Sequence, residues 1–293
     1  MPLSALLAAC AVAAHAGTPT SADLPPLDAG TSLLVIAPHP DDEILCCAGV
    51  MQRVVRAGGR ASVVWLTSGD GSELNLLFVE KSLFRSPAKL RDLAGRRMRE
   101  ARAATALLGL RAADQLFLGY PDGGVLDLLT RYYARPFTSP FTAAASVPYS
   151  DALFPGHAYT GATLERDLDA VLERVRPTLV LAPSPRDAHP DHRAAGLLAA
   201  RLLMRRGQPA ALRCWIVHGG EGWPNPRQLS PGLPLTPAPR LAGVPVATFE
   251  LTPAEEDRKL EALRAYPTQL EMLAPLLLAF VRTTELFTGA PSP

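Results

Sequence analysis

The sequence lacks the cysteine content of a disulfide-stabilised scaffold. It has 4 cysteines in 293 residues, and only Cys46, Cys47 and Cys214 lie beyond the first 20 residues. An odd number with one adjacent pair gives no disulfide framework. We therefore expect buried thiols on a helix and a strand, because free cysteine behaves as a small apolar residue.

The sequence also lacks an excess of charge of either sign. Its 29 Lys and Arg residues nearly balance its 28 Asp and Glu residues. A nucleic-acid-binding protein neutralises phosphates with a basic surface, so this balance argues against a nucleic-acid partner. A small neutral or zwitterionic ligand fits the composition better.

No apolar run at the N-terminus is long enough to span a bilayer, so we expect no transmembrane segment there. The opening MPLSALLAACAVAAHAG instead has the length of a signal peptide and ends in small residues before Gly17. Residues 1–30 are therefore expected to be a signal peptide and linker of an exported, periplasmic or extracellular protein. Cys10 is an alternative lipid-anchoring site. Because no Lys or Arg precedes the apolar run, a cytoplasmic location stays open.

The rest of the chain alternates short apolar runs with helical patterns. Strands are predicted at 33–38, 61–68, 114–120, 178–184, 213–219 and 245–251, and helices at 43–57, 87–108, 163–175, 192–206 and 253–280. This alternation predicts an α/β protein with a Rossmann-like three-layer fold, a mostly parallel sheet and strand order 3-2-1-4-5. Residues 31–285 are expected to form a single domain. No G-x-G-x-x-G follows the first strand, so the fold class gives no reason to propose a dinucleotide.

Residues 128–162 interrupt the alternation. They hold four of the six tyrosines and show no long periodic pattern. Loops of this length in a compact domain are usually functional or disordered. The aromatic content favours an ordered wall beside a pocket, over which Tyr132, Tyr133, Tyr149 or Tyr159 could fold.

Charged residues cluster directly after the first predicted strand. The stretch APHPDDEILCC places His39, Asp41 and Asp42 in the strand-to-helix turn, at the edge of the sheet where open α/β folds bind ligands. A spacing of three brings His39 and Asp42 together, close enough to share one cation. A simpler interpretation of this stretch alone is an acidic helix start.

A second stretch, TLVLAPSPRDAHPDHRAAG, repeats the layout of strand, turn and helix. It places His189, Asp191 and His192 in the turn. If this strand lies beside the first, both turns open onto the same switch point of the sheet. The two stretches together predict a metal site rather than two unrelated helix starts.

These residues resemble the PIG-L or LmbE-like zinc-dependent de-N-acetylases, whose signatures are A-H-P-D-D-E and H-P-D-H. Further patches resemble the same family: TSGDGS at 67–72, RMREARAATALLG at 97–109, YPDGG at 120–124 and KLEALRAYPTQ at 259–269. The resemblance covers residues 33–270 in patches. It implies an enzyme, a metal-dependent hydrolase acting on linear amide bonds.

The resemblance also implies a role for each matching residue. His39, Asp42 and His192 would bind Zn²⁺, with Fe²⁺ as the alternative ion, and leave an open position for water. Asp41 would be the general base. His189, held by Asp191, would be a charged imidazole that stabilises the oxyanion or protonates the departing amine. Arg97, Asp122 and His218 would contact or line the substrate.

The expected reaction is removal of the N-acetyl group from an N-acetylglucosamine-type sugar or glycoconjugate, a small-molecule partner. An amidase acting on a larger acyl group is the nearest alternative. A non-haem Fe(II) oxygenase uses the same ligand types, but it needs no base such as Asp41. A metal-retaining sugar-binding protein without turnover is the third alternative.

Overall fold

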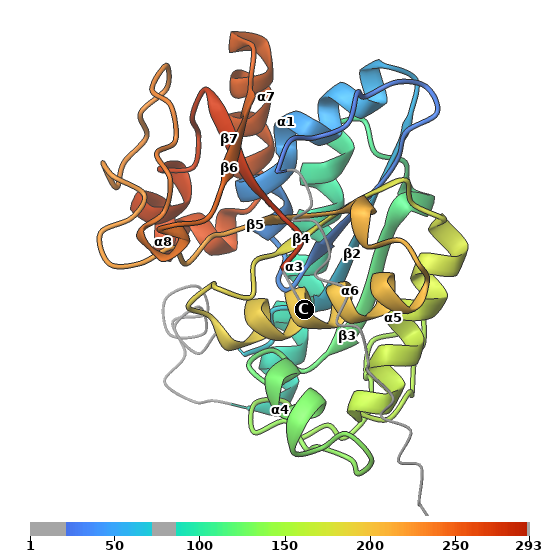
Figure 1. Cartoon of the computed structure of the whole chain (residues 1–293). Helices are drawn as coiled ribbons and strands as arrows, with labels where there is room; N and C mark the ends of the chain where they lie inside the picture. Colours follow the sequence, from blue (N-terminus) through green and yellow to red (C-terminus); the bar gives the residue numbers. More distant parts are fainter. Residues whose placement is uncertain (1–21, 72–85, 292–293) are drawn as a thin grey trace, which may run out of the picture.

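The computed structural model describes residues 22–71 and 86–291, and a seven-stranded sheet runs through the middle of the molecule (Figure 1). The strand order is β3-β2-β1-β4-β5-β7-β6. The predicted leader lies outside the described residues, so it stays a prediction. Within the described ranges, no helix has the length and apolarity that crossing a membrane requires.

Helices and strands alternate through most of the chain. The strands are β1 Ser32–Ala37, β2 Arg60–Thr67, β3 Gln115–Tyr120, β4 Leu179–Pro183, β5 Leu212–Trp215, β6 Val246–Glu250 and β7 Thr284–Gly289. The α-helices are α1 Asp42–Arg56, α3 Pro87–Leu107, α4 Val125–Thr130, α5 Gly161–Val175, α6 Pro190–Arg205, α7 Pro253–Arg264 and α8 Pro267–Leu278.

Strands β1 to β5 are parallel, and β7 pairs antiparallel with both β5 and β6. Helix α7 contacts both α1 and α3 on one face of the sheet, and α4, α5 and α6 contact one another on the other face. Helices on both faces bury the central strands completely, which explains the continuous apolar run LLVIA of β1. The predicted three-layer fold and the order 3-2-1-4-5 are confirmed.

The C-terminal part differs from the prediction. The helix expected at 253–280 is two helices, α7 and α8, which meet at Tyr266 and Pro267. Pro267 stands at the first position of α8, where the missing N–H of proline costs no hydrogen bond within the helix. The final strand β7 was not predicted, and it extends the sheet to Gly289, past the expected domain boundary at 285.

The bonding state of the cysteines agrees only in part with the expectation. Cys46 and Cys47 of α1 are joined by a disulfide, so the prediction of free thiols is wrong for this pair. A bond between adjacent residues encloses no other residue, so it is not the kind of framework that cysteine spacing indicates. Cys214 is a free buried cysteine on β5, as expected.

Helix α6 lies unusually close to the end of β4, and a glycine allows it. A Cβ atom on Gly196 would stand 2.1 Å from the carbonyl oxygen of Pro183, inside the contact distance of any real side chain. The close approach sets the first turn of α6, with His192, directly over the carboxyl end of the sheet. The sequence around Gly196 thus helps to fix the position of the second histidine stretch.

Candidate metal centre and active site

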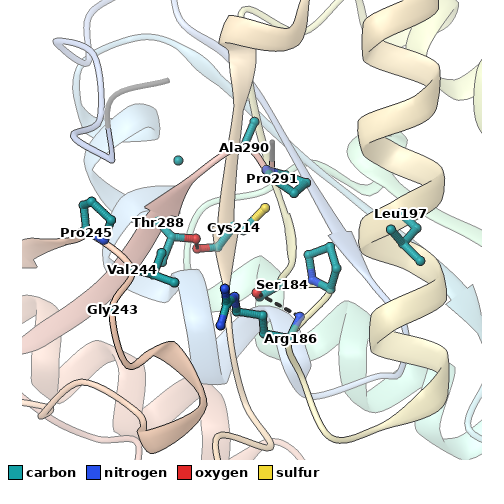
Figure 2. Close-up of a pocket in the computed structure, with 12 residues that line it drawn as sticks. Ser184, Arg186, Leu197, Cys214, Gly243, Val244, Pro245, Thr288, Ala290 and Pro291 are labelled. Atoms are coloured by element: carbon teal, nitrogen blue, oxygen red, sulfur yellow. Dashed lines mark hydrogen bonds between the residues drawn. The ribbon is translucent and has the colours of Figure 1, made fainter. Parts of the chain in front are cut away.

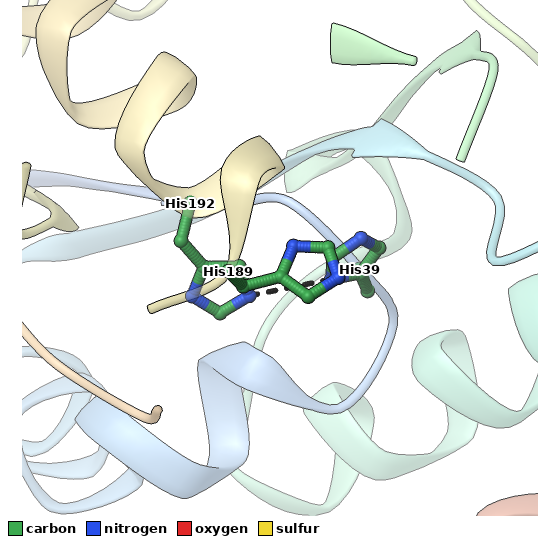
Figure 3. A group of neighbouring side chains, drawn as sticks. All are labelled: His39, His189 and His192. Carbon is green, nitrogen blue, oxygen red and sulfur yellow. Dashed lines mark hydrogen bonds between the residues drawn. The ribbon is translucent and has the colours of Figure 1, made fainter. Parts of the chain in front are cut away.

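The turns that follow β1 and β4 meet, as the sequence predicts. Asp42 Oδ2 lies 3.3 Å from His39 Nδ1 and 3.2 Å from His192 Nε2, and the two ring nitrogens are 3.3 Å apart. Figure 3 shows the rings of His39 and His192 facing each other at the start of α6, with His189 beside them. Three donor atoms from opposite halves of the chain therefore form a nearly equilateral triangle.

The triangle has the dimensions of one face of a tetrahedral metal site. Donors about 2.0–2.1 Å from a tetrahedral ion stand about 3.3–3.4 Å from each other. The ligand atoms of His39, His189 and His192 also lie within 4.8 Å of one another, and so do those of two further groups, Asp187 with His192 and His218, and His39 with Asp122 and Asp191. Two imidazoles and a carboxylate suit Zn²⁺ or Fe²⁺.

His39 presents its two ring nitrogens to different partners. Nε2 lies 3.2 Å from Asp122 Oδ1 and 3.3 Å from Asp191 Oδ2, while Nδ1 faces Asp42 and His192. A metal-binding histidine commonly donates its other ring N–H to a carboxylate, which fixes its orientation. The arrangement leaves Nδ1 as the nitrogen of His39 that can bind a cation.

Asp187 faces the second ring nitrogen of His192, as Asp122 and Asp191 do for His39, and this role was not predicted. Its Oδ2 lies 3.2 Å from His192 Nδ1 and accepts the backbone N–H groups of Val217 and His218, each at 3.0 Å. Its Oδ1 accepts the N–H of His189 at 2.8 Å. The carboxylate is fully buried, so its charge acts on the imidazole with little screening by water. An acidic residue five positions before His192 was the available signal.

The protonation states match a site built for positive charge. Burial opposes the ionised form of Asp42, but His192 and His39 outweigh it and hold the pKa of Asp42 well below its usual value. Burial lowers the pKa of His192, but Asp42 and Asp187 raise it to about 9. Burial likewise opposes a charged His39, yet mainly Asp122 raises the pKa of His39 well above 6.5. In the metal-free protein, protons thus occupy the donor atoms that a cation would use.

Asp191 does not hold His189, contrary to the prediction. Its carboxylate accepts the N–H groups of Gly123 at 2.7 Å and Val125 at 3.0 Å and approaches His39 Nε2. Only the backbone N–H of Asp191 contacts His189, donating to its Nδ1 at 3.2 Å. Asp191 therefore couples the second histidine stretch to the turn after β3.

The surroundings of His189 in the metal-free protein favour its neutral ring, whereas the expectation was a charged imidazole. Burial and the charges of His39 and His192 lower the pKa of His189 to about 4. Because Nδ1 accepts a hydrogen bond, the ring carries its proton on Nε2, and the residue lines the pocket beside the site. It can donate a hydrogen bond without being an imidazolium. His218, which also lines the pocket as predicted, has its pKa lowered to about 4 by burial and His192.

Asp41 lies beside the triangle in a strained backbone conformation. Its φ of 122° lies in a region that residues other than glycine rarely adopt. Its N–H donates to Glu43 Oε2 at 3.1 Å, and its Oδ2 lies 3.5 Å from Arg97 Nη2. Burial and the charge of Asp42 raise the pKa of Asp41 to about 8. The surroundings thus hold the Asp41 carboxyl in place and favour its proton-bound form.

Glu43 is the fully buried support of Asp41. Besides the Asp41 N–H, it accepts hydrogen bonds from Trp65 Nε1 at 2.9 Å and from the Tyr266 hydroxyl. Burial raises the pKa of Glu43 to about 7, although the bonds from Tyr266 and Trp65 oppose the rise. The bonds tie the turn after β1 to strand β2 and to the junction of α7 and α8.

Arg97 braces the same turn from α3. Its guanidinium donates to the carbonyl oxygens of Gly69 and Pro40, each at 2.9 Å. A Cβ atom on Gly69 would lie 2.0 Å from Arg97 Nη1, so only glycine leaves room for the guanidinium. Arg97 also lines the pocket, so its predicted contact with substrate is sterically open.

A pocket of about 230 Å³ opens beside the triangle. Its lining includes every substrate-contacting residue predicted above, together with unpredicted residues of α8. The lining residues are His39, Asp41, Asp42, Leu45, Gly71, Arg97, Asp122, His189, Val217, His218, Gln269, Leu273, Leu276 and Leu277.

The segment 128–162 is ordered but is not a wall of this pocket, which corrects the prediction. Among the described lining residues none comes from it. Tyr149 donates its hydroxyl to Asp70 at 2.6 Å, and Tyr159 donates to the Gly119 carbonyl at 3.0 Å. Both rings are buried against β3 instead of facing ligand, because the segment packs beside that strand.

A larger cavity of about 540 Å³ lies elsewhere, between α6 and the β5–β7 pair (Figure 2). Figure 2 shows Arg186, Cys214 and Thr288 on one side and Leu197 of α6 on the other. Burial raises the pKa of the Cys214 thiol to about 12, so it is no nucleophile at neutral pH. The smaller pocket, which contains the converging histidines and carboxylates, is the better candidate for chemistry.

Fold and site together define an α/β protein with a buried two-histidine, one-carboxylate group at the switch point of its sheet. A family model described as GlcNAc-PI de-N-acetylase, PIG-L, matches residues 34–203. A 1D-myo-inositol 2-acetamido-2-deoxy-alpha-D-glucopyranoside deacetylase of Saccharopolyspora erythraea is 31% identical over 268 residues, covering 84% of this chain and 80% of the relative. The chain belongs to the PIG-L family.

Solved structures share the fold at lower identity. The N,N'-diacetylchitobiose deacetylase of Pyrococcus horikoshii has a TM-score of 0.53 at 20% identity, covering 87% of this chain and 82% of that one. GalB, the 4-carboxy-2-hydroxymuconate hydratase of Pseudomonas putida KT2440, has a TM-score of 0.53 at 21% identity, covering 85% and 82%. Because a hydratase and a deacetylase share this fold, the reaction has to be argued from the site.

Proposed function

We propose that this chain is a divalent-metal-dependent hydrolase that removes the acetyl group from an N-acetylglucosamine-type sugar or glycoconjugate. The triangle of His39 Nδ1, Asp42 Oδ2 and His192 Nε2, with sides of 3.2–3.3 Å, carries the proposal. Family membership and the named activity of the Saccharopolyspora relative support the acetamido sugar as substrate. Zinc is the proposed ion.

The residues present fit a catalytic cation, because three donors leave a further coordination position open. When bound, a divalent cation acts as a Lewis acid on the amide carbonyl and makes water more acidic. His39, Asp42 and His192 would hold it. Asp122, Asp187 and Asp191 keep the two imidazoles in orientation.

Asp41 is the proposed general base, and the neutral His189 is the proposed hydrogen-bond donor to the oxyanion. A bound cation would favour the ionised form of Asp41, which removes a proton from the attacking water as the C–O bond forms. His189 Nε2–H stabilises the negative charge on the former carbonyl oxygen. Asp41 then returns the proton to nitrogen as the C–N bond breaks, which releases acetate and an amine. Both residues line the pocket beside the triangle.

Acetate release tests this function directly. The purified metal-loaded protein should release acetate from N-acetylglucosamine conjugates, with an equal amount of free amine, and a chelator should stop the reaction. Oxygen consumption in the presence of Fe²⁺, with no acetate formed, would support an oxygenase instead. Sugar binding without product would support a non-catalytic protein.

Metal affinity should depend steeply on pH. Because the pKa values of His39 and His192 are raised, both rings are protonated at neutral pH and must lose their protons to bind a cation. Two displaced protons make the apparent affinity rise by up to about 100-fold per pH unit below the lower of the two pKa values. Competition with a chromophoric chelator between pH 6 and 8 measures this slope. A flat profile would show that neither ring releases a proton.

Removing the side chain of Glu43 should misplace the general base. In Glu43→Ala the Asp41 N–H loses its acceptor, and we expect kcat to fall by up to about 100-fold with metal content retained, since small displacements of catalytic groups have effects of this size. Glu43→Gln keeps an oxygen acceptor and should restore most of kcat. Steady-state kinetics and metal analysis of both variants provide the check. Equal losses in both would mean that the charge of Glu43, and not its hydrogen bonding, matters.

A further inference from the structure

The pocket beside the metal centre is lined by two kinds of side chain. One group consists of the histidines, the carboxylates and Arg97 described above, and the other group, here called the apolar wall, carries no polar side-chain atom. The apolar wall is formed by Leu45 of α1, Val217 after β5, and Leu273, Leu276 and Leu277 of α8. Leucine and valine side chains offer no hydrogen-bonding partner to a sugar hydroxyl, so this wall suits an apolar part of a ligand better than a sugar ring.

Helix α8 runs along the pocket over more than two turns. Gln269, Leu273, Leu276 and Leu277 stand at positions i, i+4, i+7 and i+8, which share one face of a helix. At 1.5 Å per residue, the stripe from Gln269 to Leu277 extends about 12 Å. It begins with a polar residue and continues with leucines only, so the pocket becomes apolar along the helix.

Within residues 22–71 and 86–291, no side chain fills the space in front of the leucines on this stripe. Leu273 and Leu276 pack against the core on one side but remain only partly buried. Leu277 is buried at 3% exposure, yet it too lines the cavity. Apolar surface that faces a pocket next to reactive groups is available to a ligand, and covering it is favourable in proportion to the area removed from water.

We infer that the substrate carries an alkyl chain, or a similarly extended apolar group, that lies against α8 while its amide is held at the metal centre. The inference rests on the proposed function. The single methyl of an acetyl group is far shorter than the stripe of about 12 Å. The chain can be attached to the amide as a longer acyl group or to the sugar as an apolar aglycone, and both present the same chemistry to α8.

Two substrate series distinguish these attachments. The first varies the acyl group on glucosamine from N-acetyl to N-hexanoyl, and the second varies the aglycone of N-acetylglucosaminides from methyl to hexyl. In the series that matches, each added CH₂ should raise kcat/KM by about fourfold, which corresponds to about 0.8 kcal/mol per buried CH₂. A kcat/KM independent of length in both series overturns the inference, while turnover of the methyl N-acetylglucosaminide still supports the proposed function.

Variants of α8 test where the chain lies. In Leu273→Asn and Leu276→Asn, the factor by which kcat/KM rises per added CH₂ should fall from about four to nearly one. The matched control is Leu270→Asn, a partly buried leucine on the same helix that does not line the pocket, and it should keep the fourfold gain. Thermal unfolding of each variant confirms that it folds. A gain that survives in Leu273→Asn and Leu276→Asn alike overturns the inference.

A binding measurement keeps the inference testable even without turnover. Alkyl glucosides contain no amide, and calorimetric titration of the metal-loaded protein compares hexyl glucoside with methyl glucoside. Tighter binding of the hexyl compound, abolished in Leu276→Asn, supports the apolar subsite even if every acetamide substrate proves inert. Equal affinities for the two compounds would contradict it.

Discussion

His192→Ala should cost the protein its catalytic metal and with it nearly all activity. The substitution removes one corner of the donor triangle, because His192 Nε2 lies 3.2 Å from Asp42 Oδ2 and 3.3 Å from His39 Nδ1. Substitution of a residue that only contacts a metal ligand typically lowers metal affinity by about 10- to 100-fold. Loss of a ligand itself should lower metal affinity by more than this. Metal content after dialysis and the dissociation constant from chelator competition measure the effect.

Asp187→Asn is the matched control for that variant. It keeps the metal donors but weakens the orientation of His192, whose Nδ1 lies 3.2 Å from the Asp187 carboxylate. We expect a loss of metal affinity within the range of about 10- to 100-fold that applies to such supporting residues. If His192→Ala still bound one equivalent of metal as tightly as Asp187→Asn, His192 would not be a ligand.

Asp41→Asn should separate catalysis from metal binding. The change removes the base but keeps the size of the side chain, and asparagine tolerates a positive φ better than alanine does. We expect kcat to fall by about 100- to 10,000-fold, the range for a general acid–base residue, with metal affinity unchanged. Steady-state rates at saturating metal, together with metal analysis of the same sample, give both values.

The neighbouring residue supplies the contrasting control. Asp42→Asn should weaken metal binding first, because Asp42 Oδ2 lies within 3.3 Å of both imidazole donors. The activity per bound metal ion should then change less than the metal affinity does. If Asp41→Asn stripped the metal while Asp42→Asn retained it, the proposed roles of the two aspartates would have to be exchanged.

The sequence was sufficient to predict the order of the five parallel strands and the meeting of the two histidine stretches. Both follow from local signals, since apolar runs mark buried parallel strands and ligand sites form at their carboxyl ends. The approach of Asp42 to His192 within 3.2 Å, across 150 residues of chain, is the outcome of that topology. The motifs that resemble the family therefore lie where the fold places them together.

Pairings inside the site could not be predicted in the same way. Asp191 sits next to His192 in the sequence, yet its carboxylate turns to the backbone of Gly123 and Val125. Asp187 orients His192 from five positions upstream because the turn after β4 folds back on itself. Such choices depend on side-chain direction and on which N–H groups the neighbouring loops leave open, and no residue spacing encodes these.

The apolar wall was missed for a different reason. Sequence periodicity assigns the leucines of residues 267–278 to a helix and its core-facing side, but it does not show that the chain breaks at Tyr266 and returns toward the pocket. Leu273 and Leu276 read as ordinary core residues until the site is assembled around them. Tyr149 is the converse case, because it was expected to fold over the pocket and instead donates its hydroxyl to Asp70.

Anomalous diffraction from a crystal of the zinc-loaded protein tests the central claim most directly. We predict a single strong peak within about 2.0–2.2 Å of His39 Nδ1, Asp42 Oδ2 and His192 Nε2. A peak located instead among Asp187, His192 and His218, or among His39, Asp122 and Asp191, would contradict the assignment of the metal ligands and the reaction derived from it.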